Sequence, residues 1–113
     1  VNDTFGHGAG DDVLRAVVDL VRPRLRATDA LARWGGEEFA VLLPHTTGAE
    51  AVSLAEDLRA LVGGAALPHD ASLTVSIGVA ELRIDDSVDT WFERADHAMY
   101  AAKDAGRDAV RRL

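Results

Sequence analysis

Apolar residues recur at helical spacing in the stretch that follows Gly10-Asp11. Six of them form one stripe along a predicted helix: Val13, Leu14, Val17, Val18, Val21 and Leu25. Pro23 falls inside this pattern, and we expect it to kink or end the helix near Val21-Arg22 because proline has no N–H to donate. Asp11 and Asp12 would lie in the first turn, where unpaired N–H groups favour acids. Residues 2–11 carry three glycines and several Asn, Asp and Thr residues, which predict a loop.

Two further helical patterns begin at capping signals and end at glycine. Thr47 followed by Glu50 fits a capping box, and Gly63-Gly64 would stop that helix. Its apolar face is predicted to consist of Ala51, Leu54, Ala55, Leu58, Leu61 and Val62. The third helix follows Asp85-Asp86-Ser87, which supplies its cap, and Gly106 would end it. Its buried stripe is predicted to be Trp91, Phe92, Ala95, Ala98, Met99 and Ala102.

Three apolar runs of a different kind predict strands. Residues 29–34 and 39–43 are expected to form a β-hairpin, because the Gly35-Gly36 pair between them supplies the positive φ that a tight type I′ turn needs. Residues 73–82 alternate between larger and smaller side chains and carry no charge before position 81, which indicates a strand covered on both faces. Ala109-Val110 would begin a short final strand.

The order of these elements is helix, hairpin, helix, strand, helix and short strand. It predicts one α+β domain over residues 1–113, a two-layer sandwich in which helices pack on a central antiparallel sheet. Such a sheet needs another strand beside the hairpin. The chain starts at Val1 without an initiating Met. We therefore expect it to be a piece of a longer protein in which that strand comes first.

Composition narrows the range of partners. The chain has 19 acidic and 12 basic residues and a formal net charge of −7, which argues against a polymeric nucleic acid as partner. A nucleotide remains possible, because a metal ion can bridge carboxylates and phosphates. The absence of cysteine excludes disulfide scaffolds and thiolate metal sites and permits a reducing compartment such as the cytoplasm. No apolar run approaches the roughly 18 residues of a membrane span, so we expect this domain to make no membrane contact.

The tip of the predicted hairpin is the first candidate site. A turn without side chains lets a phosphate chain approach the backbone at Gly35 and Gly36, and the carboxylates of Glu37 and Glu38 could hold a divalent cation beside it. Adjacent strand residues point to opposite faces, so the two acids cannot face one ligand with the same geometry. The alternative is a solvated hairpin tip with two ordinary surface acids.

The predicted loop at the start of the chain holds polar residues that suit a purine. A carboxylate such as Asp11 can accept from both donors on the guanine edge, and the Asn2 amide can both accept and donate. The alternatives are turn formation by Asn2 and helix capping by Asp11. His7 could contact a sugar or base, or could only fix the loop.

Two pairs of charged residues are also candidates. Lys103 and Arg107 are four residues apart at the end of the last predicted helix, where they could bind phosphates or only favour the negative helix end. Arg26 and Asp29 could bind a phosphate or a guanine edge, or form a surface ion pair of little energetic value. Other acids are interpreted as solvated surface or helix caps, among them Asp57, Asp85, Asp86 and Asp89.

Taken together, these residues resemble the GGDEF family of diguanylate cyclases over nearly the whole chain. The matching segments are Asn2-Asp3, Gly6-His7, Gly10-Asp11, Arg26-x-x-Asp29, Arg33-Trp34-Gly35-Gly36-Glu37-Glu38-Phe39, Leu43-Pro44, residues 74–80 and residues 95–107. In order and spacing this match is far more specific than the five-residue signature alone. The resemblance implies a ferredoxin-like fold of the nucleotide-cyclase palm type. It also implies Mg²⁺-dependent or Mn²⁺-dependent condensation of two GTP molecules into cyclic di-GMP, with release of pyrophosphate.

The resemblance also implies a role for each matching residue. Glu37 would ligate the metal and help to deprotonate the attacking 3′-hydroxyl, and Glu38 would support the metal site. The substrate-binding residues would be Gly35 and Gly36 beside the phosphates, Asn2, His7 and Asp11 on the guanosine, and Lys103 and Arg107 on the phosphates. Arg26 and Asp29 fall where the family binds its product as an inhibitor. Each domain would hold one GTP, so catalysis would need a homodimer with two domains facing each other.

Two departures from the family pattern carry their own expectations. The family has a metal-binding Asp and a phosphate-binding Lys on a strand before the position of Asn2, and neither falls within these residues. We therefore expect the 113-residue chain by itself to be a poor catalyst. Asp57 stands where many relatives carry an Arg that completes the inhibitory site. The alternative functions are a non-catalytic cyclic di-GMP receptor that uses Arg26 and Asp29, and an inert dimerisation module.

Overall fold

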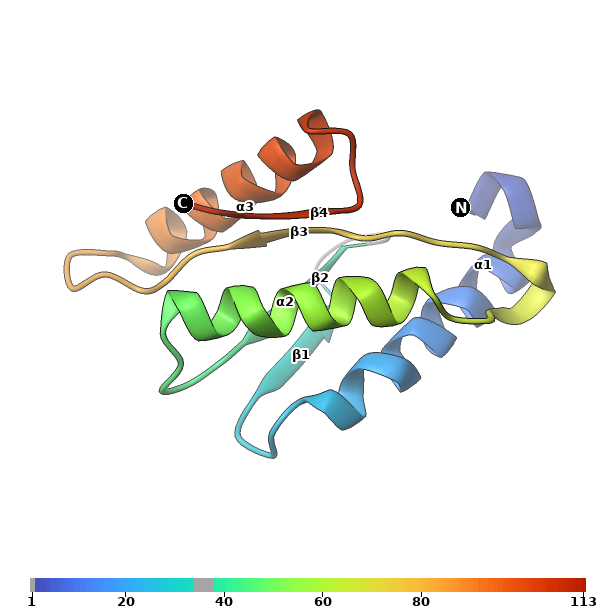
Figure 1. Cartoon of the computed structure of the whole chain (residues 1–113), viewed down its shortest axis with the longest axis horizontal. Helices are drawn as coiled ribbons and strands as arrows, with labels where there is room; N and C mark the ends of the chain where they lie inside the picture. The colour runs from blue at the N-terminus through green and yellow to red at the C-terminus, as the bar shows by residue number, and fades with distance from the viewer. Residues whose placement is uncertain (1, 34–37) are drawn as a thin grey trace. The chain divides into compact units, whose positions relative to one another are not determined.

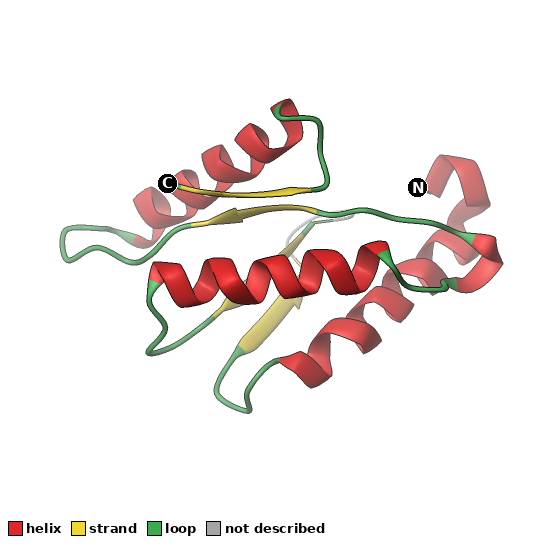
Figure 2. Ribbon diagram, viewed as in Figure 1, coloured by secondary structure: helices red, strands yellow, loops and turns green. Residues whose placement is uncertain are grey.

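The computed structural model describes residues 2–33 and 38–113, apart from the side chains of residues 2–7, 9 and 33. Its helices and strands are shown in Figures 1 and 2. The chain divides into two compact units, of which the first holds residues up to 45 together with 64–73, and the second holds 46–63 and 74–113. None of the helices within the described ranges is long and apolar enough to cross a membrane.

The first unit begins with α1 (Asn2–Val21), which ends where the sequence predicts. The short helix η1 (Arg22–Arg24) follows at once with Pro23 in its first turn, so the prediction that this proline ends the regular helix is confirmed. A second short helix, η2 (Pro68–Asp70), also contacts α1. The buried apolar residues of this unit come from α1 and from either side of η2: Val13, Leu14, Val17, Val21, Leu67 and Ala71.

The start of α1 corrects the sequence analysis. Residues 2–11 were predicted to form a loop, and the structure instead makes them part of the helix. The physical reason is that Asn, Asp and Thr at the very beginning are residue types that favour a helix N-terminus. Each glycine lowers helix stability by about 1 kcal/mol without breaking the helix. Asp11 therefore lies in the helix interior, and the interpretation of Asp11 as a helix cap is wrong.

The predicted hairpin is confirmed. Strands β1 (Ala30–Arg33) and β2 (Phe39–Leu42) pair antiparallel, from Ala30 opposite Leu42 to Arg33 opposite Phe39. The predicted glycine turn between them lies outside the described residues.

The second unit contains α2 (Gly48–Gly63), β3 (Ser76–Val79), α3 (Val88–Asp104) and β4 (Ala109–Arg112). Strands β3 and β4 are parallel and are joined by α3, because parallel neighbours need a long crossover. Both α2 and α3 contact β3 and β4, and in Figure 1 the strand pair runs between the two helices. The α+β fold class is confirmed, although β3 is shorter than predicted. The further strand before Asn2 stays a prediction.

The predicted helix boundaries in this unit rest on hydrogen bonds that the structure supplies. At the start of α2, the Glu50 N–H donates to Thr47 Oγ1 (3.1 Å) and the Thr47 N–H donates to Glu50 Oε1 (2.9 Å), which is the capping box expected from the sequence. Ser87 caps α3 in the same reciprocal way with Thr90. Of the two predicted apolar faces, Ala55, Leu58 and Val62 of α2 and Ala98 and Ala102 of α3 are buried, and the other members are half-buried.

Helix α3 lies against the backbone of β3. A Cβ added at Gly78 would overlap the carbonyl oxygen of Ala95 and the backbone nitrogen of Met99. The indole N–H of Trp91 donates to the Ala80 carbonyl at 2.8 Å, just beyond the end of β3. Gly78 is therefore required by a close approach of helix to strand.

A mostly buried ion pair fixes the loop that leads from β3 into α3. The Arg94 guanidinium donates to both oxygens of Asp86, at 2.8 and 2.7 Å, and the two side chains are 14% and 7% exposed. The Arg83 N–H also donates to Asp86 at 2.7 Å. These donors, Arg94 first, hold the pKa of Asp86 far below its ordinary value. The interpretation of Asp86 as solvated surface is therefore wrong.

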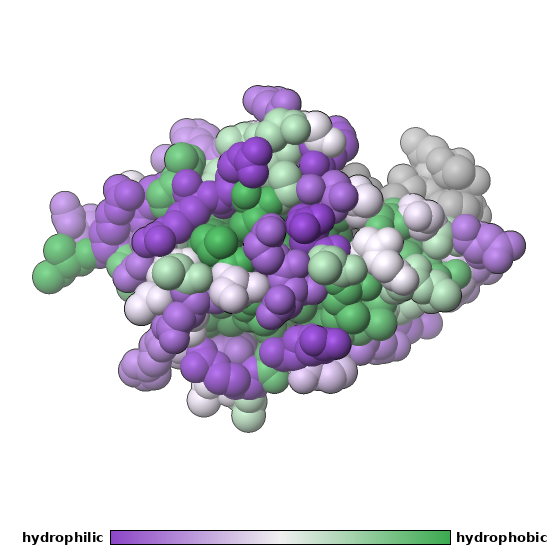
Figure 3. Space-filling view, in the orientation of Figure 1, coloured by the Kyte–Doolittle hydropathy of each residue, from purple (hydrophilic) through white to green (hydrophobic). Residues whose placement is uncertain are grey.

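The same loop carries exposed apolar residues. Leu82 is 56% exposed and Ile84 is fully exposed. Figure 3 shows hydrophobic residues at the projecting tip of this loop, next to hydrophilic residues.

We expect Gly78→Ala to destabilise the domain by about 1–3 kcal/mol, because the added methyl group meets backbone atoms that cannot move aside. Gly63→Ala is the matched control, since nothing lies within 4 Å of a Cβ at that position. Denaturant unfolding measures both changes. An equal stability for Gly78→Ala and the parent would contradict the close packing of α3 on β3.

The lowered pKa of Asp86 predicts how stability depends on pH. A carboxyl group whose pKa is depressed on folding stabilises the protein above its unfolded pKa of about 3.9, and this stabilisation is lost as the pH falls through the folded pKa. Asp86→Asn should therefore unfold more easily at pH 7, and the difference from the parent should shrink below about pH 4. Thermal unfolding at several pH values measures this, with exposed Asp85→Asn as the control. A gap that stays constant down to pH 2–3 would exclude the ion pair as its cause.

Candidate active site

Strands β1 and β2 flank the candidate metal ligands in the sequence. Their register ends with Arg33 opposite Phe39, and Glu38 directly precedes Phe39 and is half-buried. The predicted site residues Gly35, Gly36 and Glu37 lie outside the described residues. The described strands therefore include the first and the last residue of the signature.

The donor set at this hairpin suits magnesium. Mg²⁺ takes oxygen ligands and is commonly held by one or two carboxylates together with phosphates of the substrate. Glu37 and Glu38 supply that kind and number of ligands. Among the residues that the structure describes, no group of three or more His, Asp or Glu side chains could hold a metal ion.

The predicted guanosine-binding residues all belong to α1. Asn2 and His7 lie in its first half, and Asp11 is exposed in its middle. The neighbouring Asp12 is held from outside the helix, because its Oδ2 lies 3.1 Å from the His69 Nε2 of η2. His69 has a positive φ of 61°, so an unusual backbone conformation presents this contact. The contact joins η2 to α1 next to Asp11.

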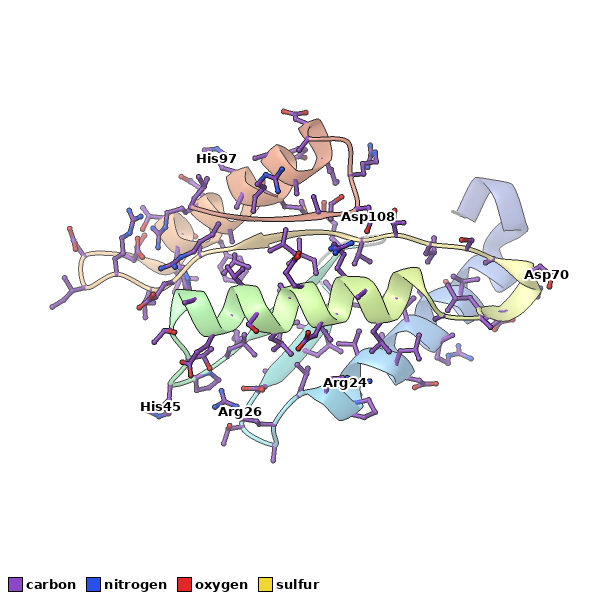
Figure 4. The ribbon with its side chains drawn as sticks, in the orientation of Figure 1. Arg24, Arg26, His45, Asp70, His97 and Asp108 are labelled. Atoms are coloured by element: carbon purple, nitrogen blue, oxygen red, sulfur yellow. The ribbon has the colours of Figure 1, made fainter. Side chains whose placement is uncertain are left out.

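Arg26 and Asp29 are joined to each other just before the hairpin. The Arg26 N–H donates to Asp29 Oδ2 at 2.8 Å, and Arg26 Nη2 donates to Asp29 Oδ1 at 3.0 Å and to the Pro44 carbonyl at 2.7 Å. Figure 4 shows Arg26 close to His45, the residue after Pro44. The Asp29 side chain is 2% exposed and the Arg26 side chain 54%. The hydrogen bonds from Arg26 lower the pKa of Asp29, so this carboxylate is charged at neutral pH.

The end of α3 differs from the sequence prediction. Lys103 lies in the last turn of the helix, with Nζ 5.2 Å from the centre of the Tyr100 ring. Arg107 lies beyond the helix, which ends at Asp104. The helical spacing expected for Lys103 and Arg107 therefore does not apply, because Gly106 stops the helix between them.

The turn after α3 has a defined hydrogen-bond pattern. The Gly106 N–H donates to the Lys103 carbonyl at 3.2 Å, and the Arg107 N–H donates to the Ala102 carbonyl at 3.1 Å. This pair of bonds is the Schellman arrangement in which glycine adopts a left-handed conformation. Gly106 has a φ of 109°, which confirms the predicted glycine stop.

Arg59 is a residue that the sequence analysis missed. From α2 it donates through Nη1 to Asp108 Oδ1 at 3.0 Å and through Nε to Glu56 Oε1 at 3.2 Å. Asp108 lies in the turn between α3 and β4 and is labelled in Figure 4. Nothing in the sequence could pair these two residues, because they are 49 positions apart.

Glu81, which lies beyond the end of β3, links the start of α2 to the end of β4. Glu81 Oε1 accepts from the N–H of Gly48, at the start of α2, at 2.7 Å. It also accepts from Arg112 Nη2, near the end of β4, at 3.2 Å. The Arg112 guanidinium occupies the space that a Cβ on Gly48 would need.

The predicted site residues are divided between the two units. The first unit holds the α1 residues, the hairpin and the Arg26–Asp29 pair, and the second holds Lys103 and Arg107. Within the units the structure brings Arg26 onto Asp29 and Lys103 onto Tyr100.

Comparison with known sequences finds a matching family and relatives that carry the same name. The family described as diguanylate cyclase, GGDEF domain, matches residues 1–109. Diguanylate cyclase DgcM of Escherichia coli K12 is 44% identical over 110 residues, which cover 97% of this chain and 27% of that protein. Diguanylate cyclase DgcP of Pseudomonas aeruginosa is 46% identical over 115 residues, covering 97% of this chain and 17% of that protein. The chain thus spans about a quarter or less of the length of these curated relatives.

Comparison with solved structures agrees. The coiled coil and GGDEF domain of DgcB from Caulobacter crescentus, in complex with c-di-GMP, has a TM-score of 0.92 and 33% identity over 99% of this chain and 62% of that one. Diguanylate cyclase SiaD from Pseudomonas aeruginosa, in complex with its activator SiaC, has a TM-score of 0.89 and 40% identity over 100% of this chain and 45% of that one. The confirmed hairpin, the family match and the shared fold lead to one conclusion: this chain belongs to the GGDEF domain family of diguanylate cyclases.

Proposed function

We propose that the protein carrying this domain is a diguanylate cyclase, which condenses two GTP molecules into cyclic di-GMP and releases pyrophosphate. The observation that carries this proposal is the signature at residues 33–39, which stands complete in a chain of the GGDEF family. The confirmed pairing of β1 with β2 supports it, because both ends of the signature belong to one hairpin. In each condensation a 3′-oxygen bonds to the α-phosphorus of the other nucleotide, and pyrophosphate leaves from that phosphorus.

The hairpin would hold the metal and the phosphates. Glu37 and Glu38 provide the carboxylate oxygens, and Gly35 and Gly36 leave the backbone N–H groups open to phosphate oxygens. Mg²⁺ bound there would neutralise charge that builds up on the phosphoryl group during in-line displacement. Glu37 would also accept a hydrogen bond from the 3′-hydroxyl and help to remove its proton.

The remaining site residues would bind the rest of the nucleotide. Lys103 and Arg107 would contact the phosphates as cations. Asn2, His7 and Asp11 would recognise the guanosine, and Asp11 suits the two donors of the guanine edge because its carboxylate is exposed on α1.

The chemistry of the product implies a second copy of the domain. Cyclic di-GMP joins two nucleotides symmetrically, and this chain carries one set of the proposed residues. We therefore propose a homodimer in which two domains face each other during catalysis. The GTP requirement also leads us to propose that the domain works in the cytoplasm.

In the full-length protein with GTP and Mg²⁺, we expect Glu37→Gln to lower cyclic di-GMP formation by roughly 100-fold or more, because the variant keeps the size of the side chain and loses its charge. Glu93→Gln is the control, since it makes the same chemical change at an exposed site on α3. Product is quantified by chromatography. Equal rates for the parent and Glu37→Gln would exclude this glutamate as a metal ligand.

A second candidate function is binding of cyclic di-GMP through Arg26 and Asp29. The favouring observation is that Asp29 is nearly covered and charged while about half of the Arg26 side chain is accessible. Arg26, held in place by its bonds to Asp29 and Pro44, could therefore contact a phosphate or a purine edge. In a catalytic protein, binding of cyclic di-GMP at this pair would inhibit the enzyme by its product. In a protein without catalysis, the same binding would make the domain a receptor.

We expect Arg26→Ala to weaken cyclic di-GMP binding at least tenfold in calorimetry, because a charge-assisted contact is removed. Arg24→Ala is the matched control, an exposed arginine two residues earlier that Figure 4 also labels. Thermal unfolding of both variants checks that the lost Pro44 contact has not unfolded the hairpin. Unchanged affinity in a folded Arg26→Ala protein would rule out this site.

A further inference from the structure

The turn after α3 has an unusual backbone. Three consecutive residues adopt positive φ: Gly106 at 109°, Arg107 at 65° and Asp108 at 46°. Glycine takes this conformation freely, whereas an arginine takes it at a cost and an aspartate only somewhat more easily. Such conformations persist where neighbouring contacts hold them, and they gather at functional sites. The contacts that hold this turn therefore bear on whatever Arg107 does.

Hydrogen bonds to α3 hold only the first part of the turn. The Gly106 and Arg107 N–H groups are bonded to α3 carbonyls. Asp108 is held instead by its side chain, which accepts from Arg59 Nη1 at 3.0 Å. The Arg59 side chain is 27% exposed, and its Nε donates to Glu56 Oε1 at 3.2 Å. The Glu56–Arg59–Asp108 chain thus ties the far end of the turn to α2.

Arg107 depends on this backbone more than Lys103 does. Lys103 lies on a regular helix and over the Tyr100 ring. The Arg107 side chain is exposed, and among the residues that the structure describes no ion pair holds it. The conformation of the turn is therefore what aims the Arg107 guanidinium.

We propose that Arg59 is a positioning residue for binding of the nucleoside triphosphate. By holding Asp108, it keeps the left-handed turn in the conformation that presents Arg107 to the phosphates. This inference rests on the proposed function, because it takes Arg107 as a phosphate contact. Arg59 itself would touch no substrate.

An arginine suits this task better than a lysine. Its planar fork bonds Glu56 through Nε and Asp108 through Nη1 at the same time, whereas a lysine offers one point charge on a flexible stem. Arg59→Lys should therefore keep the charge and retain only part of the positioning of Asp108.

The competing explanation is that Arg59 merely fastens α2 to the start of β4. The chain offers a matched control for it at the opposite ends of α2 and β4. There the exposed Glu81 carboxylate pairs with Arg112 of β4 and accepts from the Gly48 N–H of α2. Arg112→Ala breaks a bridge between the same elements and leaves the turn after α3 alone. A purely structural role predicts similar effects for Arg59→Ala and Arg112→Ala.

The test uses the full-length protein and compares Arg59→Ala, Arg59→Lys, Asp108→Asn and Arg112→Ala. We expect Arg59→Ala to raise KM for GTP roughly tenfold with kcat changed less than about twofold, since an interaction made equally in the ground and transition states is lost. Asp108→Asn should do the same and keeps the turn accessible, because asparagine tolerates positive φ. The double variant Arg59→Ala/Asp108→Asn should be no worse than Arg59→Ala alone, because that single change already removes the bond between the two residues. Arg59→Lys should fall between, and Arg112→Ala should match the parent.

Equilibrium binding separates this inference from the proposed function. Calorimetry with a non-hydrolysable GTP analogue and with GMP should show weaker triphosphate binding and unchanged GMP binding in Arg59→Ala, Asp108→Asn and Arg107→Ala. If Arg107→Ala weakens the analogue and the other two do not, the positioning role is overturned while the proposed function stands. If Arg107→Ala has no effect, the phosphate role fails and the inference falls with it. Equal losses for the analogue and GMP, or a loss in Arg112→Ala as large as in Arg59→Ala, would also overturn it.

Discussion

The close contact between α3 and β3 at Gly78 is the constraint on which the second unit depends. Because no side chain separates the helix from the strand there, the axis of α3 is set by backbone atoms of Ala95 and Met99. Both ends of the helix are then closed by local hydrogen bonds, through Ser87 at its start and Gly106 at its end. The proposed phosphate contacts are attached to this fixed end. A rigid helix that carries functional residues on the turn beyond it is a common way to position a site.

Ion pairs in this unit hold the loop and the turn that connect its helices and strands. Asp86 and Arg94 hold the loop before α3, and Arg59 with Asp108 holds the turn after it. All of them use arginine, whose several donors can satisfy a carboxylate and a second acceptor together. The first unit repeats the principle where Arg26 links Asp29 to Pro44 below the hairpin. In a chain with a net charge of −7, these arginines bond to carboxylates in loops and turns.

Features written in neighbouring residues could be predicted from the sequence. The stop at Pro23, the Thr47 capping box, the hairpin strands and the glycine after α3 all depend on residues within a few positions of each other. The glycines in residues 2–11 misled the prediction because their weak helix propensity was outweighed in the fold. The Arg59–Asp108 bond could not be predicted, because only the folded chain brings these positions together. The phosphate-binding role of Lys103 and Arg107 stays a prediction, and the helical spacing that paired them does not hold beyond Asp104.

The family and the fold are confirmed, and the chemistry at the hairpin tip and at the end of α3 is proposed. A crystal structure of the full-length protein with a non-hydrolysable GTP analogue and Mg²⁺ would show whether the nucleotide binds at these residues. We expect a metal ion on Glu37, phosphate oxygens against Gly35 and Gly36, and the Arg107 guanidinium on the phosphates. A nucleotide bound away from the hairpin, with neither the glycines nor Arg107 in contact with it, would show that the proposed site is wrong.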